Sequence, residues 1–193
     1  MLSQIRPAVS VFALLTVICC GLYPLAVTVV GQAVFPSQAA GSLVYQGTTL
    51  RGSGLIGQSF TSPKYFWGRS SATGPMPNNA AGSSGSNQGP TNPAYADAVK
   101  GRVDALKAAD PGNQAAIPVD LVTASGSGLD PELSVAGIRY QLARVARARG
   151  VPEATIAALV DKAAVKPALG FLGEPRVNVL ALNLELDQIA PAK

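Results

Sequence analysis

Histidine is absent from the 193-residue sequence. A serine or cysteine nucleophile that depends on a histidine base is therefore excluded, as is a zinc site with histidine ligands. Cysteine occurs only as the adjacent pair Cys19 and Cys20 inside an apolar run. Neighbouring cysteines cannot form an unstrained disulfide, so we expect both to act as small apolar side chains. Most hydrolase chemistry is thereby removed, and the cysteines give no information on the redox compartment.

Acidic residues are absent from the first 96 positions, and all eleven of them lie in the remaining half with eleven of the fifteen basic residues. The net charge of +4 and the isoelectric point of about 9.3 raise nucleic acid as a partner. Phosphate neutralisation needs a stripe of Lys and Arg, however, and the sequence has none. We therefore expect no nucleic-acid partner. The densest basic group is typical of the solvated side of a helix and consists of Arg139, Arg144, Arg147 and Arg149.

A long uncharged segment lies near the amino terminus. No residue from Pro7 to Leu50 is charged, and residues 8–30 form an almost continuous apolar run of 23 residues. At about 1.5 Å per residue, a helix of this length crosses a hydrocarbon core of about 30 Å. Pro24 should disturb it locally, because proline removes one helical donor. The alternative is a cleaved signal peptide with its cleavage site near residues 37–39, but its apolar core is normally shorter. We expect a retained single-pass transmembrane anchor at 8–30, in the lipid bilayer of the inner (plasma) membrane.

The orientation of this anchor is predicted from the charges that flank it. Arg6 precedes the apolar run, and the next charged residue is Arg51. The positive-inside rule then places residues 1–7 in the cytoplasm and residues 31–193 outside. In a bacterium with two membranes, the outside compartment is the periplasm.

Residues 31–193 are expected to form a single soluble α+β (mixed α/β) domain, since strand and helix patterns mix and no repeat is visible. Proline, glycine, serine and asparagine dominate residues 74–93, which predicts a long irregular loop. Asn92 should cap the next helix, and Asp130 should cap a later one that has Pro131 at its first position. The predicted strands are 42–46, 117–123 and 176–180, and the predicted helices are 93–109, 131–149, 152–163 and 181–189.

Three aromatic residues, Tyr65, Phe66 and Trp67, stand in a row. Such a cluster is more often a core anchor with one ring exposed than a platform on which a ligand stacks. We therefore expect it to belong to the core, with ligand stacking as the less favoured alternative.

The helix predicted at 131–149 has one apolar stripe, which consists of Val135, Ile138, Leu142 and Val145. Spacings of three and four residues place this stripe on one face, toward the core. A helical wheel leaves four other side chains on different faces, where a partner can reach them: Tyr140, Gln141, Arg144 and Arg147.

The stretch VDLVTASGSGLDP resembles a phosphate-binding or hydrolase loop, but it fails both templates. A phosphate-binding loop needs a lysine and a hydroxyl residue after its last glycine, whereas a leucine and an aspartate follow Gly128. A nucleophile elbow needs glycines two residues before and after the serine, and neither Ser125 nor Ser127 has them. A tight strand-to-helix turn is favoured, with anion binding by its backbone donors as the alternative. No metal site is predicted, because Asp120 and Asp130 are ten residues apart.

Several ordered motifs together resemble one known family over essentially the whole chain. They are LIGQSF, PKYFWGR, GSNQGPTNP, IPVDLVTASGSGLDPELS, YQLARVARARG and FLGEPRVNVLALNLELD, after a single anchor. The sequence is thereby similar to the C subunit of the bacterial Kdp potassium-transporting P-type ATPase. The resemblance implies a non-catalytic accessory subunit of an ATP-driven potassium uptake complex. Its partners would be the ATP-hydrolysing subunit and the potassium-conducting subunit.

Two alternative roles for the soluble domain follow, the first implied by the resemblance and the second by the predicted orientation of the anchor. In the first, the chain is a catalytic chaperone that raises the ATP affinity of the ATPase subunit through Gln141, with Ser125, Ser127 and Gly128 as further nucleotide-binding residues. ATP would then be shared with that subunit, and no cofactor would be tightly bound. In the second, the domain lies outside and braces or covers the ion entrance of the conducting subunit without touching nucleotide. A distant alternative is an anchored hydrolase that uses Ser125 or Ser127.

Overall fold

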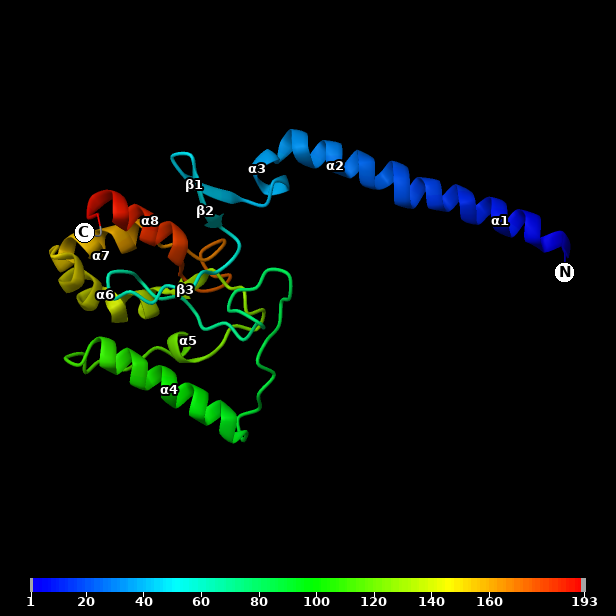
Figure 1. The fold of residues 1–193 in the computed structure, drawn as a ribbon. Coiled ribbons are helices and arrows are strands. Elements are labelled where there is room, and N and C mark those ends of the chain that lie inside the picture. Colours follow the sequence, from blue (N-terminus) through cyan, green and yellow to red (C-terminus); the bar gives the residue numbers. More distant parts are fainter. Residues whose placement is uncertain (1, 192–193) are drawn as a thin grey trace. The chain divides into compact units, whose positions relative to one another are not determined.

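The computed structural model of the chain describes residues 2–191, which form two compact units with the boundary after Leu43 (Figure 1). The first unit is an amino-terminal helix, and the second is a mixed domain of helices and short strands. The predicted fold class is confirmed: an α+β domain follows one apolar helix that is long enough to span a membrane.

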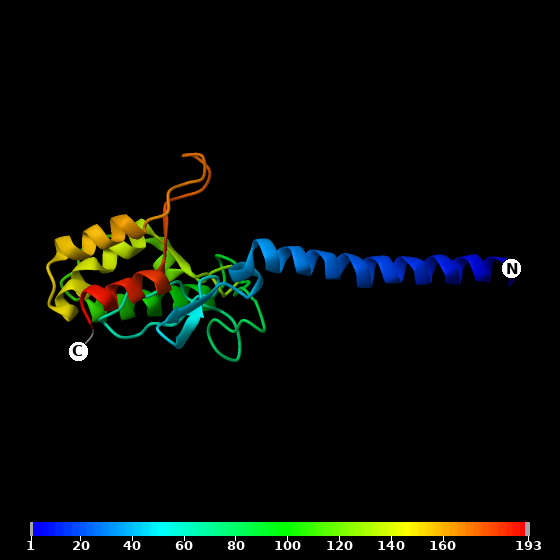
Figure 2. The same cartoon turned by 90° about the horizontal axis from the view of Figure 1, so that it is seen from above.

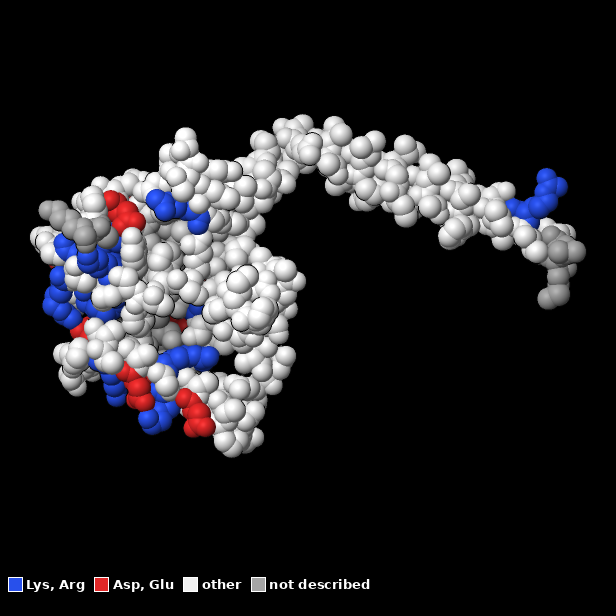
Figure 3. All heavy atoms as spheres, viewed as in Figure 1, with Lys and Arg blue, Asp and Glu red and all other residues white. Residues whose placement is uncertain are grey.

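The first unit consists of α1 (Leu2–Thr16), the π-helical stretch η1 (Val17–Leu22) and α2 (Tyr23–Val34), followed by the short α3 (Pro36–Ala39). Within the described residues, one helix is long and apolar enough to cross a membrane. It covers the 32 residues Ser3–Val34, and an 18-residue window within it has a mean hydropathy of 2.2. Figure 3 shows an uncharged surface along most of its length. The helix extends beyond residues 8–30 at both ends, and the limits of the membrane-embedded part stay a prediction.

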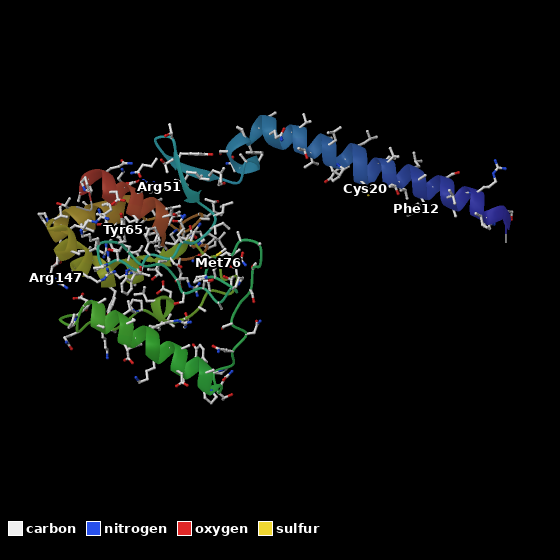
Figure 4. The ribbon with its side chains drawn as sticks, in the orientation of Figure 1. Phe12, Cys20, Arg51, Tyr65, Met76 and Arg147 are labelled. Atoms are coloured by element: carbon white, nitrogen blue, oxygen red, sulfur yellow. The ribbon has the colours of Figure 1, made fainter. Side chains whose placement is uncertain are left out.

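The disturbance expected at Pro24 takes the form of the π-helical stretch just before it. The Tyr23 N–H donates to the carbonyl of Ile18, five residues back instead of four. A proline supplies no N–H to the helix, and a wider turn adjusts the backbone around the missing bond. The side chains of Phe12 and Cys20 project from this helix with no other part of the unit packed on them (Figure 4). Cys19 and Cys20 are both free and exposed.

Within residues 44–191, the second unit combines two small two-stranded pairings with five helices of 4 to 17 residues. A hairpin of β1 (Leu43–Gln46) and β2 (Thr49–Ser53) begins it. A second sheet pairs β3 (Glu132–Ser134) with β4 (Arg176–Asn178), in a register that sets Leu133 opposite Val177. The helices are α4 (Pro93–Ala109), α5 (Val119–Val122), α6 (Val135–Arg149), α7 (Glu153–Ala163) and α8 (Val179–Ile189).

The core of this unit lies where α6, α7 and α8 meet the β3–β4 pair (Figures 1 and 2). In α7, the apolar side chains Ile156, Leu159 and Val160 are buried. In α4 only Leu106 is buried, and Val99 and Val103 pack against the core while Ala96 is exposed. The most completely buried apolar side chains are Phe66, Leu133, Ile138, Val145, Ile156, Val160, Val177, Leu182 and Leu186.

Several helix ends follow the local sequence signals. The Asn92 side chain accepts a hydrogen bond from the Ala94 N–H and so caps α4 as predicted. Gly150 ends α6 in the left-handed conformation, with φ 66°, which glycine adopts without steric cost. The irregular loop predicted for 74–93 is also observed, except that Pro93 already belongs to α4.

Two local predictions are wrong. Asp130 does not cap a helix: residues 132–134 form strand β3, and α6 begins only at Val135, where Ser134 accepts from the Gly137 N–H. Pairing with β4, which lies some forty residues later, overrides the local helix signal. Residues 119–122 form the helical turn α5 instead of a strand, and Asp120 in its first turn suits the positive end of a helix.

Candidate functional site

The main chain of Phe66 and Trp67 is gripped by two buried amide side chains. The Phe66 N–H donates to Oδ1 of Asn183 at 2.9 Å, and Nδ2 of Asn183 donates to the Phe66 carbonyl at 2.9 Å. In the same way, the Trp67 N–H donates to Oε1 of Gln141 at 2.8 Å, and Nε2 of Gln141 donates to the Trp67 carbonyl at 3.0 Å. Each amide thus replaces the partner strand that an extended segment would have in a sheet.

Two arginines of α6 complete this grip along residues 63–65. Arg144 donates to the carbonyl of Pro63 at 2.6 Å and to the carbonyl of Tyr65 at 3.1 Å. Arg149 donates from Nε to the carbonyl of Lys64 at 2.7 Å. All five carbonyls from Pro63 to Trp67 therefore accept hydrogen bonds from side chains of α6 or α8. We call residues 63–67 the gripped segment, and its partners Gln141, Arg144, Arg149 and Asn183 the clamp.

The two guanidinium groups of the clamp each lie over an aromatic ring, and one of them also forms an ion pair with a carboxylate. The Arg144 guanidinium lies 4.5 Å from the centre of the Trp67 ring, and that of Arg149 lies 4.7 Å from the Tyr65 ring. Arg149 also pairs with Asp187 at 2.8 Å, and the Tyr65 hydroxyl donates to Asp187 at 3.0 Å. Figure 4 shows Tyr65 among closely packed side chains of the domain.

Two pKa shifts follow from these surroundings. Burial lowers the pKa of Arg144 to about 10, with the charge of Asp110 opposing that shift. The guanidinium still carries its charge at neutral pH, since its pKa remains well above 7. Burial, and then the hydrogen bond to Asp187, raise the pKa of the Tyr65 hydroxyl, which keeps its proton for that bond.

The structure corrects the expected exposure of α6. Gln141 and Arg144 were expected on faces open to a partner, but they are 1% and 4% exposed, and Tyr140 is 8% exposed. Arg147 is exposed as expected, and it pairs with the buried Asp110. A helical wheel assigns only apolar side chains to the interior. Here the gripped segment covers the polar face of α6. Its main chain has no strand or helix partner, so it needs the donors and acceptors that amide and guanidinium side chains supply.

The predicted nucleotide-binding residues Gln141 and Ser125 form hydrogen bonds with different segments of the domain. The Gln141 amide bonds to the Trp67 main chain and donates to the Gly137 carbonyl at 3.2 Å. The Ser125 N–H donates to the carbonyl of Ser70 at 3.0 Å. Within residues 2–191, no hydrogen bond joins Gln141 to the serine and glycine turn. Ser125 is 3% exposed, and its hydroxyl has no hydrogen-bond partner.

The serine and glycine turn is packed against the long irregular loop. The Ser127 carbonyl accepts from the Ser84 N–H at 2.9 Å and from the Ser83 hydroxyl at 3.0 Å. Gly128 has φ 70°, and a Cβ there would come within 2.5 Å of the Thr73 side chain and 2.6 Å of the Ser84 carbonyl. Glycine is therefore required at this position, and its role is to join the turn to the loop.

A cavity of about 340 Å³ lies between the 58–71 segment and helices α4 and α5. Trp67, Leu106 and Leu121 supply apolar lining, and Arg69 and Arg102 supply positive charge. Arg69 is already paired with Asp130 at 2.9 Å, whereas Arg102 donates to the Val122 carbonyl at 2.9 Å. This chemistry suits a ligand with an apolar body and an anionic group.

The sequence did not reveal Asn183 or the cavity arginine Arg102 as functional residues, and the assignment of Arg149 to the solvated side of a helix is wrong, since its side chain is buried. Asn183 had a visible signal, since it interrupts an apolar run on α8 between Leu182 and Leu186. A buried amide in such a place must have a polar partner. Nothing in the sequence indicates which one.

Comparisons with known proteins identify the family. The sequence model described as "KdpC: K+-transporting ATPase, c chain" matches residues 5–188. A protein of Janthinobacterium sp. (strain Marseille) named "Potassium-transporting ATPase KdpC subunit" is 64% identical over 97% of this chain and 100% of its own length. Proteins of the same name from Variovorax paradoxus (strain S110) and Herpetosiphon aurantiacus are 64% and 59% identical, over 98% and 95% of both chains. The chain therefore belongs to the KdpC family of potassium-transporting ATPase c chains.

Proposed function

We propose that this chain is a non-catalytic accessory subunit whose domain lies outside the membrane and braces the potassium-conducting subunit at its ion entrance. Family membership makes it one subunit of a potassium-transporting ATPase. The observation that carries the finer proposal is the burial of Gln141, whose amide is occupied by Trp67 and Gly137 inside the domain. A side chain used in this way stabilises the fold and is not available to a nucleotide on the surface.

The flanking charges agree with an outside domain. Arg6 is the only charged residue among the first 50, and it precedes the apolar helix. A basic residue before a first membrane helix favours a cytoplasmic amino terminus. ATP is a cytoplasmic metabolite, so an outside domain acts through protein contacts and not through nucleotide.

Protease added to intact spheroplasts is expected to cut the domain, because a domain outside the membrane is accessible to it. The irregular segment 74–92 offers an exposed substrate. A carboxy-terminal epitope tag should be lost from the anchored fragment, while an amino-terminal tag should survive until the cells are lysed. Protection of the carboxy-terminal tag in intact spheroplasts would place the domain in the cytoplasm and refute the proposal.

A second candidate function is the catalytic chaperone, in which this chain raises the ATP affinity of the ATPase subunit and shares its nucleotide. The observation that favours it is the cavity beside Trp67, which offers an aromatic residue together with Arg69 and Arg102. Aromatic rings and arginines are the groups that bind a base and phosphates. Gln141 would then act indirectly, by holding the main chain of Trp67 at the cavity wall.

Substituting Arg102→Gln in the assembled complex separates the two functions. If nucleotide enters the cavity, the apparent ATP affinity should fall about fivefold or more, since a charge-assisted contact is lost. The control is Arg139→Gln, which removes an exposed arginine of α6 that pairs with Asp161. An ATP dependence that is the same for both variants and the unaltered complex would reject the chaperone role for this cavity.

A further inference from the structure

Between α7 and β4 the chain forms a narrow hairpin, residues 165–176, which we call the arm. Val165 and Arg176 exchange main-chain hydrogen bonds of 2.8 and 3.2 Å, and Ala168 and Leu172 exchange bonds of 3.0 and 2.9 Å. Figure 2 shows this segment, drawn in orange, standing away from the helices of the domain. All residues from 168 to 176 are exposed.

The tip of the arm is apolar. Leu169, Phe171 and Leu172 are 83%, 73% and 52% exposed. Leu169 has φ 55° and Gly170 has φ 82°, so a leucine occupies the left-handed region that glycine or asparagine normally fills. Side chains of this size, gathered at the end of a projection, are the usual sign of a contact with another molecule.

The base of the arm is fixed to the core, so the tip is presented in a defined place. The arm leads directly into β4, where Val177 is fully buried opposite Leu133. At the same point Arg176 forms an ion pair with Glu132 at 2.7 Å. A projection that is anchored in this way loses little conformational freedom when its tip is bound.

The size of the tip indicates what kind of partner it fits. A buried aromatic side chain removes about 150–250 Å² from water, so three apolar side chains account for roughly 400 Å². Stable interfaces between free proteins bury about 1,200–2,000 Å². The tip is therefore too small to hold a second copy of this chain or a soluble protein. It suffices for a partner already assembled beside it, because a shared membrane complex gives a high effective concentration.

The charge of the arm argues for a protein surface and against the lipid surface. Lys166 and Glu174 are its charged residues before Arg176, and their charges cancel. Surface binding to a bilayer normally combines apolar side chains with several basic residues that attract anionic lipids. An uncharged apolar tip fits an apolar recess in a protein.

We propose that the arm docks Leu169, Phe171 and Leu172 into an apolar recess on the outer side of the potassium-conducting subunit. This inference rests on the proposed function, since it names the element by which the domain attaches. The arm then acts as the fixed point of attachment outside the membrane, in addition to contacts made by the anchor.

The double variant Leu169→Asn/Phe171→Asn of the full chain, expressed with its partner subunits, tests the docking. Because Leu169 and Phe171 are 83% and 73% exposed, the unfolding temperature should change by no more than about 2 °C. The fraction of the chain that co-purifies with the conducting subunit should fall about tenfold or more. The control is Leu55→Asn, at another leucine that is 62% exposed, and it should co-purify like the unaltered chain. Equal losses from both variants, or no loss from either, would overturn the inference.

A photo-reactive phenylalanine analogue placed at position 171 identifies the occupant. Illumination of the assembled complex should give a product of this chain with the conducting subunit. A product with a second copy of the chain, or with lipid alone, would overturn the inference. If instead the unaltered chain does not co-purify with the conducting subunit at all, the proposed function itself has failed. Unaltered co-purification with no subunit product at position 171 rejects the arm alone.

Discussion

Gln141→Ala is expected to lower the free energy of unfolding of the domain by about 3 kcal/mol. The substitution leaves the Trp67 N–H and carbonyl without their partners, which lie at 2.8 and 3.0 Å in the native chain. Each buried group left unsatisfied costs about 1–3 kcal/mol, and the small cavity left by the truncation adds to this. Urea unfolding of the full chain in detergent, followed by tryptophan fluorescence, measures the loss. Trp67 is the only tryptophan, so the probe is at the site.

Two matched variants decide what the result means. Gln114→Ala removes an exposed glutamine and should change the free energy of unfolding by less than about 0.5 kcal/mol. Asn183→Ala removes the other amide of the clamp and should destabilise the domain as strongly as Gln141→Ala. A loss below about 1 kcal/mol for Gln141→Ala would contradict the clamp.

The same pair of variants bears on the chaperone role. If both clamp variants lower the ATP affinity of the assembled complex equally, the effect comes from loss of the fold around Trp67. A fall with Gln141→Ala alone would indicate that this glutamine has a role of its own toward nucleotide. Both amides bond to the main chain of the gripped segment, but only Gln141 is proposed to act toward nucleotide. Comparing the two variants therefore separates a nucleotide effect from a loss of structure.

The parts of the fold that the sequence predicts well are those decided by neighbouring residues. The Asn92 cap and the left-handed Gly150 each depend on interactions within a turn or two of helix. The apolar amino-terminal helix is evident for the same reason, since its composition alone determines it.

The parts that the sequence does not predict depend on distant partners. Strand β3 exists because residues 176–178 pair with it, so the good capping signal at Asp130 is overridden. Asp130 instead forms an ion pair with Arg69, sixty-one residues away. Short strands have weak periodicity of their own, and tertiary pairing decides them.

The clamp was beyond prediction for a related reason. The gripped segment 63–67 has no regular structure. The two amides that bond to it lie far along the chain, Gln141 74 residues after Trp67 and Asn183 117 residues after Phe66. A helical wheel assigns polar side chains to solvent, whereas Gln141 and Arg144 face a main chain that lacks partners. The resemblance to the family singles out Gln141 for a nucleotide role, which stays a prediction, whereas the structure reveals which groups this side chain contacts.

Arg149→Met is expected to lower the free energy of unfolding by about 4 kcal/mol, the largest effect of any single substitution considered. The Arg149 side chain is completely buried, and it donates to Lys64, Asp187 and the Ala190 carbonyl. Methionine keeps much of the volume but none of the donors. Removing one partner of a buried pair costs about 3–5 kcal/mol, because the other charge remains without compensation.

A double-mutant cycle separates the ion pair from the rest of the site. Asp187 keeps its hydrogen bond from Tyr65 and is 23% exposed, so water can solvate part of the abandoned charge. Adding Asp187→Asn to Arg149→Met should therefore recover about 1–2 kcal/mol of the loss. The Asp187→Asn single variant completes the cycle, and the coupling between the pair is the part of the double variant's effect that the two single effects do not add up to. The remainder belongs to the Lys64 and Ala190 carbonyls and to the Tyr65 ring.

The matched control for this cycle is Arg139→Met on the same helix. Arg139 pairs with Asp161 at 2.7 Å, but their side chains are 61% and 60% exposed. An exposed pair of this length contributes about 0–1 kcal/mol, because water competes for both charges. If Arg149→Met cost no more than Arg139→Met, burial would not be what gives the clamp its strength. A large difference between two ion pairs of nearly equal length would instead show that α6 is fastened to the gripped segment through its desolvated arginine.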